Sequence, residues 1–330
     1  MSEKIVTLSI GGGGKQTSSF IKDIILKHFG NEIIDNLGDA SYIKTTEDTA
    51  FTTDSFVVRP EFFNGGNIGK LSVCGTVNDL SVSGAKPLYL SFALVVAEGY
   101  SLEKLEKIVE SAALEAKNAG VQIVCGDTKV VERGGIDGVI INTCGVGKVI
   151  KKLNNYENVL EGDKVIVTSD IARHGMAIML ERGQFGFNGN IESDCACLNN
   201  MMDEIYGCNI KFSRDATRGG VAAVLNEIAE KSGKGFVIDE EKIPLRQDVA
   251  ELCDTLGYDP LSVANEGAAV IVVSQEDADK VLEILKSTKT GKNACIIGQV
   301  VNENKVMLNT ISGGKRLIDL PPGELLPRIC

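Results

Sequence analysis

The chain has 330 residues, of which 43% are hydrophobic and 24% are charged, and its net charge is −11. At about 150 residues per domain this length predicts two domains, and the composition is typical of a globular protein with a large core, which excludes intrinsic disorder. The acidic charge disfavours general binding to nucleic acid and to anionic membrane surfaces. A small anionic ligand would need backbone N–H groups or a divalent cation to offset the repulsion.

The N-terminal residues before the glycines are too few for a signal peptide, and the apolar run Leu88–Ala97 is about half of a membrane span. The nine cysteines are scattered, and only Cys195 and Cys197 are close in sequence. A single CxC without a second pair or a nearby histidine is a poor zinc pattern. We therefore expect a cytoplasmic protein whose cysteines are mostly small buried residues.

The first half of the chain shows both helical and strand patterns. Helices are predicted over 16–29 and 70–83, and Ser101 caps a strong helix that ends at Gly120. The segment 87–96 is apolar on both faces and is expected to be a central strand. Further strands are predicted at 42–44, 50–53, 56–58, 121–125 and 138–149.

A polar segment at 150–162 is typical of a domain boundary, and strands and helices alternate again after it. The halves lack strict βαβ alternation, so two α+β domains are expected rather than one doubly wound sheet. The Pro-rich segment from Leu320 predicts an extended tail. In this second half, helices are predicted at 219–231, 246–256 and 276–286, and strands at 164–168, 236–238, 268–273, 296–301 and 305–308.

The glycine run that ends at Gly14 and is followed by Lys15 invites interpretation as a phosphate-binding loop. A Walker A motif fails here, because Ser9 and Gln16 occupy positions that need Gly and Ser or Thr. A glycine run at a helix N-terminus can still present N–H groups to an anion, with Lys15 adding charge. A flexible loop without a ligand is an equally good interpretation.

Acidic residues recur at predicted strand ends and in glycine-bracketed loops. Each alone is more often a turn former or a cap. Together they are typical of a site in which carboxylates hold Mg²⁺ on nucleotide phosphates. Asp215 is the best placed, because Arg218 and a predicted helix N-terminus follow it. The set is Asp54, Asp79, Asp127, Asp215 and Glu266.

Neither histidine has a Cys or Asp partner at catalytic spacing. We expect His28 to be a surface residue or helix cap. We expect His174 to be a loop residue, with a place lining a site as the alternative.

The chain ends in Cys330, on a Pro-rich tail. An exposed thiol is an oxidation liability, so a cysteine at this place suggests a function, with an accidental terminal cysteine as the alternative. Arg328 favours the thiolate and the terminal carboxylate opposes it. Ten extended residues reach up to ~33 Å, enough to move the thiol from solvent into a cleft.

These features together resemble a known family. The chain is similar to the HypE hydrogenase maturation proteins, which are carbamoyl dehydratases of the aminoimidazole ribonucleotide synthetase-like ATP-binding superfamily. One departure is Ile10, where many members have His. The motifs that carry the resemblance are GGGGK, TTDSFVV, VNDLSVSGAKP, VCGDTKVV, SRDATRGGVAAVLNEIA, ANEG and the terminal PRIC.

The resemblance implies a two-domain α+β fold, a homodimer formed through the N-terminal domains, and ATP and Mg²⁺ in the cleft between domains. It divides the chain into a Gly-rich segment with a helix (1–38), an ATP-binding and dimerisation domain (39–150), a C-terminal domain (151–319) and a flexible tail (320–330).

The implied activity is one step in making the cyanide ligands of [NiFe]-hydrogenase. A partner carbamoyltransferase, HypF, loads a carbamoyl group on the terminal cysteine, and the enzyme dehydrates it to a thiocyanate with ATP. The HypC–HypD complex then takes the cyano group for iron.

By motif match, the resemblance implies metal and phosphate binding by Asp54, Asp79, Asp127 and Asp215, and phosphate contacts from Lys15 with Gly12, Gly13 and Gly14. It makes Glu266 either a metal ligand or the general base, and Cys330 the carrier.

Two alternatives remain at this point. One is a small-molecule kinase or synthetase of the same superfamily, such as a selenophosphate synthetase or a thiamine-phosphate kinase, which would need no terminal cysteine. The other is a non-catalytic maturation scaffold whose tail thiol docks on a partner.

Overall fold

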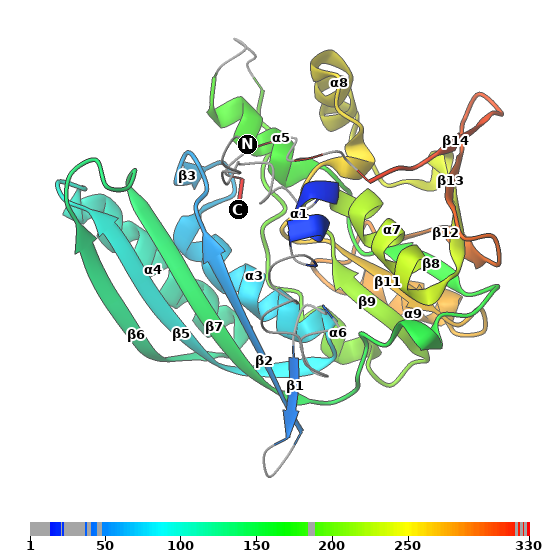
Figure 1. Cartoon of the computed structure of the whole chain (residues 1–330), viewed down its shortest axis with the longest axis horizontal. Helices are drawn as coiled ribbons and strands as arrows, with labels where there is room; N and C mark the ends of the chain where they lie inside the picture. The colour runs from blue at the N-terminus through cyan, green and yellow to red at the C-terminus, as the bar shows by residue number, and fades with distance from the viewer. Residues whose placement is uncertain are drawn as a thin grey trace, which may run out of the picture.

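A computed structural model of the chain contains two mixed α/β units, each built on one large sheet (Figure 1). The structure describes residues 14–20, 22, 37, 41–44, 48–183, 189–320, 323, 326, 329 and 330. Two α+β units in place of one doubly wound sheet confirm the predicted fold class.

The first unit has a five-stranded sheet in the order β1-β2-β7-β5-β6. Helices α3 and α4 pack against each other; α3 contacts β2, β7 and β5, while α4 contacts β6. Its elements are β1 (Ser41–Lys44), β2 (Asp48–Phe56), β3 (Phe62–Phe63), β4 (Gly66–Asn67), α3 (Ile68–Val82), β5 (Ala85–Ala97), α4 (Leu102–Ala119), β6 (Gln122–Val131) and β7 (Val139–Val149). A short helix, α1 (Lys15–Phe20), precedes them.

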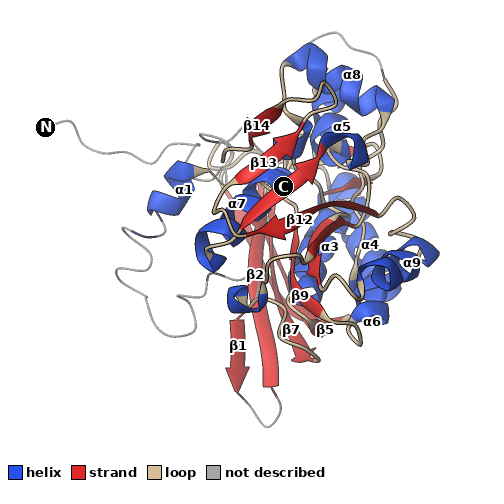
Figure 2. Ribbon diagram, turned by 90° about the vertical axis from the view of Figure 1, so that its right-hand side faces the viewer, coloured by secondary structure: helices blue, strands red, loops and turns tan. Residues whose placement is uncertain are grey.

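The second unit has a seven-stranded sheet in the order β14-β13-β10-β12-β8-β11-β9. Helices α6 and α9 pack together at the other end of this unit from α8 (Figure 2). Its elements are β8 (Lys164–Val167), α5 (Arg173–Glu181), α6 (Asn199–Ile205), β9 (Ile210–Asp215), α7 (Gly220–Ser232), β10 (Gly235–Asp239), α8 (Gln247–Leu256), β11 (Ala269–Val273), α9 (Ala278–Ser287), β12 (Cys295–Val301), β13 (Val306–Asn309) and β14 (Lys315–Leu317).

Helix α4 forms where its sequence predicts it. The Ser101 side chain accepts a hydrogen bond from the Lys104 N–H, and Gly120 ends the helix with a φ of 71°. Residues with the left-handed backbone at this position are usually glycine, because other side chains are strained there. Ile108, Ala112, Ala116 and Ala119 form its buried face.

Helix α3 joins the two units. Nearly all of its residues are buried, and besides the first sheet it contacts α6 and β9 of the second unit. The Asn78 amide of α3 donates to the carbonyls of Ala196 and Glu266, and its oxygen accepts from the Leu198 N–H. Because these partners belong to the second unit, α3 fixes where that unit's loops lie.

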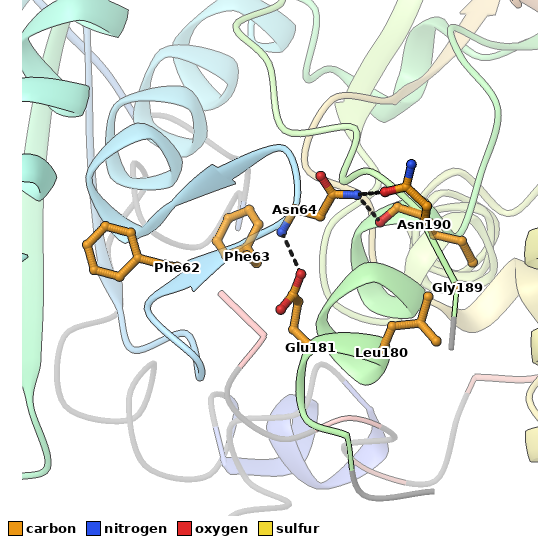
Figure 3. A pocket seen from close by; sticks show the side chains of 8 residues that line it. Phe62, Phe63, Asn64, Leu180, Glu181, Gly189 and Asn190 are labelled. Carbon is orange, nitrogen blue, oxygen red and sulfur yellow. Dashed lines mark hydrogen bonds between the residues drawn. The ribbon is translucent and has the colours of Figure 1, made fainter. Parts of the chain in front are cut away.

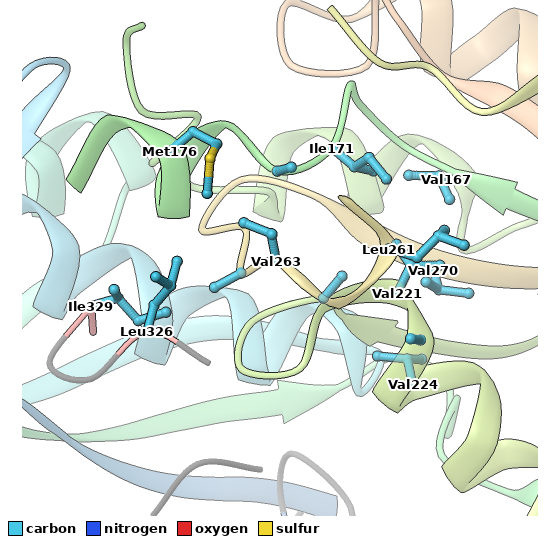
Figure 4. Close-up of a cluster of buried hydrophobic side chains, with 14 of the residues drawn as sticks. Val167, Ile171, Met176, Val221, Val224, Leu261, Val263, Val270, Leu326 and Ile329 are labelled. Atoms are coloured by element: carbon cyan, nitrogen blue, oxygen red, sulfur yellow. The ribbon is translucent and has the colours of Figure 1, made fainter. Parts of the chain in front are cut away.

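The last residues of the chain pack onto the core of the second unit. Leu326 and Ile329 are buried, and Figure 4 shows both beside Met176 and Val263. A Cβ on Gly175 would lie 3.1 Å from Leu326 Cδ1, which shows how closely the tail approaches α5. The tail end is therefore docked.

Several predicted elements differ from the structure. The two strands expected at 50–53 and 56–58 are one strand, β2, because its residues pair continuously with β7 up to Phe56. The strand expected at 121–125 continues to Val131 as β6. Most of the helix expected at 16–29 lies outside the described residues. Helices α5 and α6 and strands β9 and β14 were not predicted.

A search of the described helices finds none with the length and apolar character needed to cross a membrane.

The close contact between α3 and α4 depends on Gly69. A Cβ at this position would lie 2.0 Å from the Ile108 carbonyl oxygen. Gly69→Ala is therefore expected to lower the free energy of unfolding by about 1–3 kcal/mol, the usual cost of overpacking. Urea unfolding followed by circular dichroism measures this. Gly207→Ala is the matched control, because a Cβ there meets no atom within 4 Å; equal effects of the two changes would contradict the packing argument.

Candidate functional site

Four carboxylates from both units converge between the two sheets. Asp54 lies on β2, Asp215 is the last residue of β9, and Glu266 lies in the loop before β11. Burial raises the pKa of Glu266 well above its usual value, and the nearby Cys195, Asp215, Asp194 and Asp54 raise this pKa further. The structure thus brings together three residues that the sequence singled out, and adds Asp194.

Asp194 shapes the Glu266 loop. Its carboxylate accepts the backbone N–H groups of Glu266, at 3.2 Å, and of Gly267, at 2.9 Å. Burial raises the pKa of Asp194, while Arg173 and these N–H groups oppose the increase. Sequence reasoning missed this residue because its role arises from a segment 72 positions away along the chain. Only its place directly before the CxC pair could have drawn attention to it.

The carboxylates are suited to a divalent cation. The Oε1 atom of Glu266 is buried and has no hydrogen-bond partner among the described residues. Burial raises the pKa of Asp54, and the Arg218 charge only partly opposes this. Several buried carboxylates with raised pKa values stabilise a bound cation, since hard oxygen ligands are what Mg²⁺ prefers.

Asp79 lies on α3, and its Oδ2 accepts a hydrogen bond from the Thr52 hydroxyl at 2.8 Å. Thr52 is two residues before Asp54 on β2. The Asp79 and Thr52 side chains therefore belong to the contact between α3 and β2. The helix predicted over 70–83 is confirmed as α3, so Asp79 lies in a helix as expected. The prediction that Asp54 follows the end of a strand is wrong, because β2 continues to Phe56.

Within one chain, Asp127 lies apart from the carboxylates of Asp54, Asp194, Asp215 and Glu266. It lies inside β6, not after a strand as predicted, and its side chain is exposed. The strands between the two aspartates are β7 and β5. Asp54 pairs with Thr143 of β7. The neighbouring residue of β7, Asn142, pairs with Ala93 of β5, and Ala93 pairs with Asp127 of β6. Three strand spacings of about 4.8 Å separate Asp54 from Asp127. A role for Asp127 beside the other carboxylates of the same chain therefore stays a prediction.

The glycine run is described only at its end. The Gly14 carbonyl accepts a hydrogen bond from the Ser18 N–H at 3.1 Å, and Lys15 is exposed at the start of α1. Gly12 and Gly13 lie outside the described residues. Phosphate binding by this segment stays a prediction.

Cys330 lies at the end of β2, close to Asp54. Its carbonyl accepts a hydrogen bond from the Val57 N–H at 3.2 Å, and Val57 is three residues beyond Asp54. Three residues of extended chain span at most about 10 Å. The docked tail therefore places the terminal cysteine beside the strand that carries the first carboxylate.

His174 holds the tail from the other side. It lies in α5 and not in the predicted loop, and its Nε2 contacts the Ile329 carbonyl while its Nδ1 lies 2.8 Å from the Ser193 hydroxyl. Because a carbonyl only accepts, Nε2 must carry the proton, and Nδ1 then accepts from Ser193. Burial lowers the pKa of His174 to about 4. The ring also makes an edge contact with Phe63, with centroids 5.4 Å apart.

A shallow groove of about 480 Å³ adjoins this end of the site (Figure 3). Asn64 lies in it: its backbone N–H donates to Glu181 Oε1 at 3.2 Å, and its side-chain amide donates to Asn190 Oδ1 at 2.9 Å. The groove is lined by residues of β3 and α5 and by none of the residues predicted from the sequence. Its lining residues are Phe62, Phe63, Asn64, Leu180, Glu181, Gly189, Asn190 and Ile191.

Two family models match the two units. The N-terminal domain of AIR synthase related proteins matches residues 37–149, and the C-terminal domain of AIR synthase related proteins matches residues 161–309. Both matches agree with the division of the chain into two sheets.

Among known proteins, the chain is 44% identical to carbamoyl dehydratase HypE of Rhodobacter capsulatus, over 100% of this chain and 99% of the relative. It is 40% identical to carbamoyl dehydratase HypE of Escherichia coli, over 98% and 99%. A solved HypE–HypF complex matches with a TM-score of 0.88 and 46% identity, covering 92% of this chain and 100% of the other. HypE solved in complex with ATP matches with a TM-score of 0.83 and 38% identity, covering 99% and 100%.

The buried histidine makes stability depend on pH. The folded-state pKa of His174 is about 4, below the usual 6.5, so the unfolded chain takes up a proton first as the pH falls. The native protein should lose about 2 kcal/mol of its unfolding free energy between pH 8 and pH 5 through this residue.

His174→Gln keeps a donor for Ile329 and an acceptor for Ser193 but does not titrate, so this part of the pH dependence should disappear. Urea unfolding at both pH values measures the difference between the variant and the native chain. His28→Gln, at the other histidine, is the control. Parallel pH dependence of the native chain and His174→Gln would contradict the assignment.

Proposed function

Because this chain belongs to the HypE family of carbamoyl dehydratases, within the AIR synthase related proteins, we propose that it dehydrates a carbamoyl group on its own Cys330 with ATP. The product is a thiocyanate, and its cyano group serves the iron site of [NiFe]-hydrogenase during maturation. The full-length similarity to carbamoyl dehydratases does not favour a small-molecule kinase of the same superfamily.

The docked position of Cys330 is the observation that carries this proposal. The Cys330 carbonyl accepts from the Val57 N–H, three residues beyond Asp54 on β2, so the terminal cysteine is docked on the strand that carries one of the converging carboxylates. A small-molecule kinase would need this space for its substrate. A carrier that presents its own cargo instead needs the tail docked here.

The chemistry requires activation of the carbamoyl oxygen, because hydroxide is a poor leaving group. Transfer of the γ-phosphoryl group of ATP to this oxygen, with loss of one proton from nitrogen, releases ADP and leaves an S-bound O-phosphorylated imidate. Loss of the remaining proton from nitrogen and cleavage of the carbon–oxygen bond then give the thiocyanate and phosphate. The sum is the loss of one water from the carbamoyl group and the hydrolysis of one ATP. Sulfur suits the carrier, since the cyano group can later leave from a thiolate.

We assign Glu266 as the base that removes the proton from nitrogen. Burial and nearby carboxylates raise its pKa, and a raised pKa gives a carboxylate a higher affinity for a proton. Its Oε1 has no hydrogen-bond partner among the described residues, so it is available to a substrate N–H. Asp194 positions Glu266 through its backbone N–H.

Mg²⁺ would be held by Asp54 and Asp215, with Asp79 supporting the contact between α3 and β2. When bound, the ion neutralises the phosphates of ATP and so lowers the repulsion from an acidic protein. Arg218, which interacts electrostatically with Asp54, adds positive charge on the same side. Lys15 with Gly12, Gly13 and Gly14 is proposed to contact phosphate from the N-terminal segment.

The partners follow from the carrier role. HypF is proposed to load the carbamoyl group, and the HypC–HypD complex to accept the cyano group. Because the Ile329 and Cys330 carbonyls are hydrogen-bonded in the docked tail, each exchange requires these two bonds to open. The nine cysteines, none of them in a disulfide, are consistent with a reducing cytoplasm.

A homodimer is proposed to form through the first unit. The edge strand β6 is exposed along nearly its whole length, and Val124 and Val130 keep 58% and 65% of their surface accessible. An exposed apolar edge strand is a liability in a monomer and is usually covered. Asp127 belongs to this strand, so a dimer would bury its surroundings.

Cys330→Ala is expected to bind ATP as the native chain does but to accept no carbamoyl group. Intact mass measurement after incubation with HypF, carbamoyl phosphate and Mg·ATP tests this. The native chain should gain one carbamoyl group on the C-terminal peptide and then lose the mass of one water. Cys125→Ala, at an exposed cysteine of β6, is the control and should behave as the native chain.

Glu266→Gln should accept the carbamoyl group but should not dehydrate it, because the base is missing.

ATP consumption without any adduct on the native chain would favour a small-molecule kinase. An adduct on Cys330→Ala would show that the carrier is another residue.

Val130→Glu is expected to shift the protein toward the monomer, because a charge on the exposed edge cannot be buried against a second copy without a partner. Light scattering after size exclusion measures the mass. Leu317→Glu, at a similarly exposed residue of the edge strand β14, is the control. An unchanged mass of Val130→Glu would exclude β6 from the dimer interface.

A further inference from the structure

Three cysteines and a glutamate that are scattered in sequence meet between the two units. Cys74 comes from α3, Glu115 from α4, and Cys195 and Cys197 from the segment before α6. The Cys197 Sγ lies 3.6 Å from the Cys74 Sγ. The ligand atoms of Cys74, Cys197 and Glu115 all lie within 4.8 Å of one another. In the sequence only Cys195 and Cys197 are close together, and this pair is a poor match to a zinc motif. The fold brings Cys74 of α3 to the pair, which the sequence spacing could not show.

The distances fit tetrahedral coordination. Zinc–sulfur bonds of about 2.3 Å place two sulfur ligands about 3.8 Å apart on the edge of a tetrahedron. The observed 3.6 Å is close to this edge. A disulfide would need the two sulfurs at about 2.05 Å, so its formation would require α3 and the CxC segment to move together.

Cys195 is a neighbour of this group and not one of its members. Its thiol is buried and interacts with the Cys74 thiol, but its sulfur is not among the ligand atoms that lie within 4.8 Å of one another. Cys74 is also buried, while Cys197 and Glu115 are half-buried. Two sulfur ligands and one carboxylate oxygen are ligand types that zinc uses, and a site with three protein ligands has water in its fourth position.

A positive charge faces the group. Lys70 lies one helical turn before Cys74 on α3, and it interacts electrostatically with all three cysteines and Glu115. Its Nζ donates to the Gly65 carbonyl at 2.9 Å, which keeps the ammonium group in place without occupying a ligand. Thiolates and a carboxylate on one ion carry excess negative charge, and Lys70 reduces it.

We propose that Cys74, Cys197 and Glu115 bind one Zn²⁺ ion, with water as the fourth ligand. Thiolate ligands select Zn²⁺ or Cu⁺. The carboxylate favours Zn²⁺, because Zn²⁺ is a harder ion than Cu⁺. The ion joins α3 and α4 to the segment that carries Asp194. Since Asp194 accepts the N–H groups of Glu266 and Gly267, the ion also fixes the loop that holds Glu266. The metal site supports the Glu266 loop, but none of its thiols takes part in the chemistry of the proposed reaction.

Metal content and affinity test the proposal. The full-length native chain, stripped with a chelator and titrated with Zn²⁺ alone against a chromophoric competitor, should bind one ion per chain. Cys74→Ser and Cys197→Ser should bind it more than about 100-fold more weakly, because losing a ligand exceeds the usual loss from an outer-sphere change. Cys253→Ser, at a buried cysteine of α8, is the matched control and should bind as the native chain.

Cobalt provides the spectroscopic signature. Co²⁺ in place of Zn²⁺ should produce sulfur-to-cobalt charge-transfer absorption in the native chain and in Cys253→Ser, and this absorption should be lost in Cys74→Ser. If the serine variants do not fold, the native chain still gives an answer. Bound Zn²⁺ should protect Cys197 from maleimide, while Cys295 of β12, which is half-buried in the second unit, reacts at the same rate with and without the metal.

Equal affinity of Cys74→Ser and the native chain would overturn the proposal and place the ion at the carboxylates. A native chain that binds no Zn²⁺ but forms a Cys74–Cys197 disulfide with hydrogen peroxide would also overturn it. Neither result depends on whether the chain dehydrates a carbamoyl group.

Discussion

The burial of α3 between the two units is the constraint on which the rest of the structure depends. This helix packs on the first sheet, contacts α6 and β9 of the second unit, and exposes almost nothing to solvent. It therefore needs small or apolar residues on every side, and its few polar groups must find partners in neighbouring elements. Asn78 and Asp79 do so by bonding to the Glu266 loop and to β2. In this way the helix that joins the units also aligns the two halves of the site.

The site combines charges that repel one another. Glu266, Asp194, Asp215 and Asp54 lie close together, and burial raises the pKa of most of them. Such an arrangement costs folding free energy and persists because the surrounding packing holds it. A cation and the phosphates it accompanies would relieve the repulsion, which is how an acidic protein can bind ATP. The docked tail then provides the thiol that the carboxylates and nucleotide would act on.

Local signals explain which elements could be predicted. Helix α4 has a serine cap, a regular apolar face and a terminal glycine, so its ends agree with the sequence to within a residue. Helices α5 and α6 have no side-chain cap and span only nine and seven residues, so periodicity is too short to reveal them. Asp54 and Asp127 resemble turn residues in sequence, yet pairing with β7 and β5 places them within strands. Tertiary hydrogen bonding here overrides local preference.

By itself the sequence determined the two-unit α+β fold and Cys330 as the residue that needed an explanation, and it predicted an acidic set, Asp54, Asp79, Asp127, Asp215 and Glu266, of which Asp54, Asp215 and Glu266 lie together. Each of these rests on composition, motifs or a chain end, which are local properties. Only the tertiary structure decided that the tail is docked on His174 and Val57, that Asp194 supports Glu266, and that Cys74 and Glu115 join the CxC pair. These contacts join residues many tens of positions apart. The packing of α3 against both units sets them, and no local pattern in the chain records that packing.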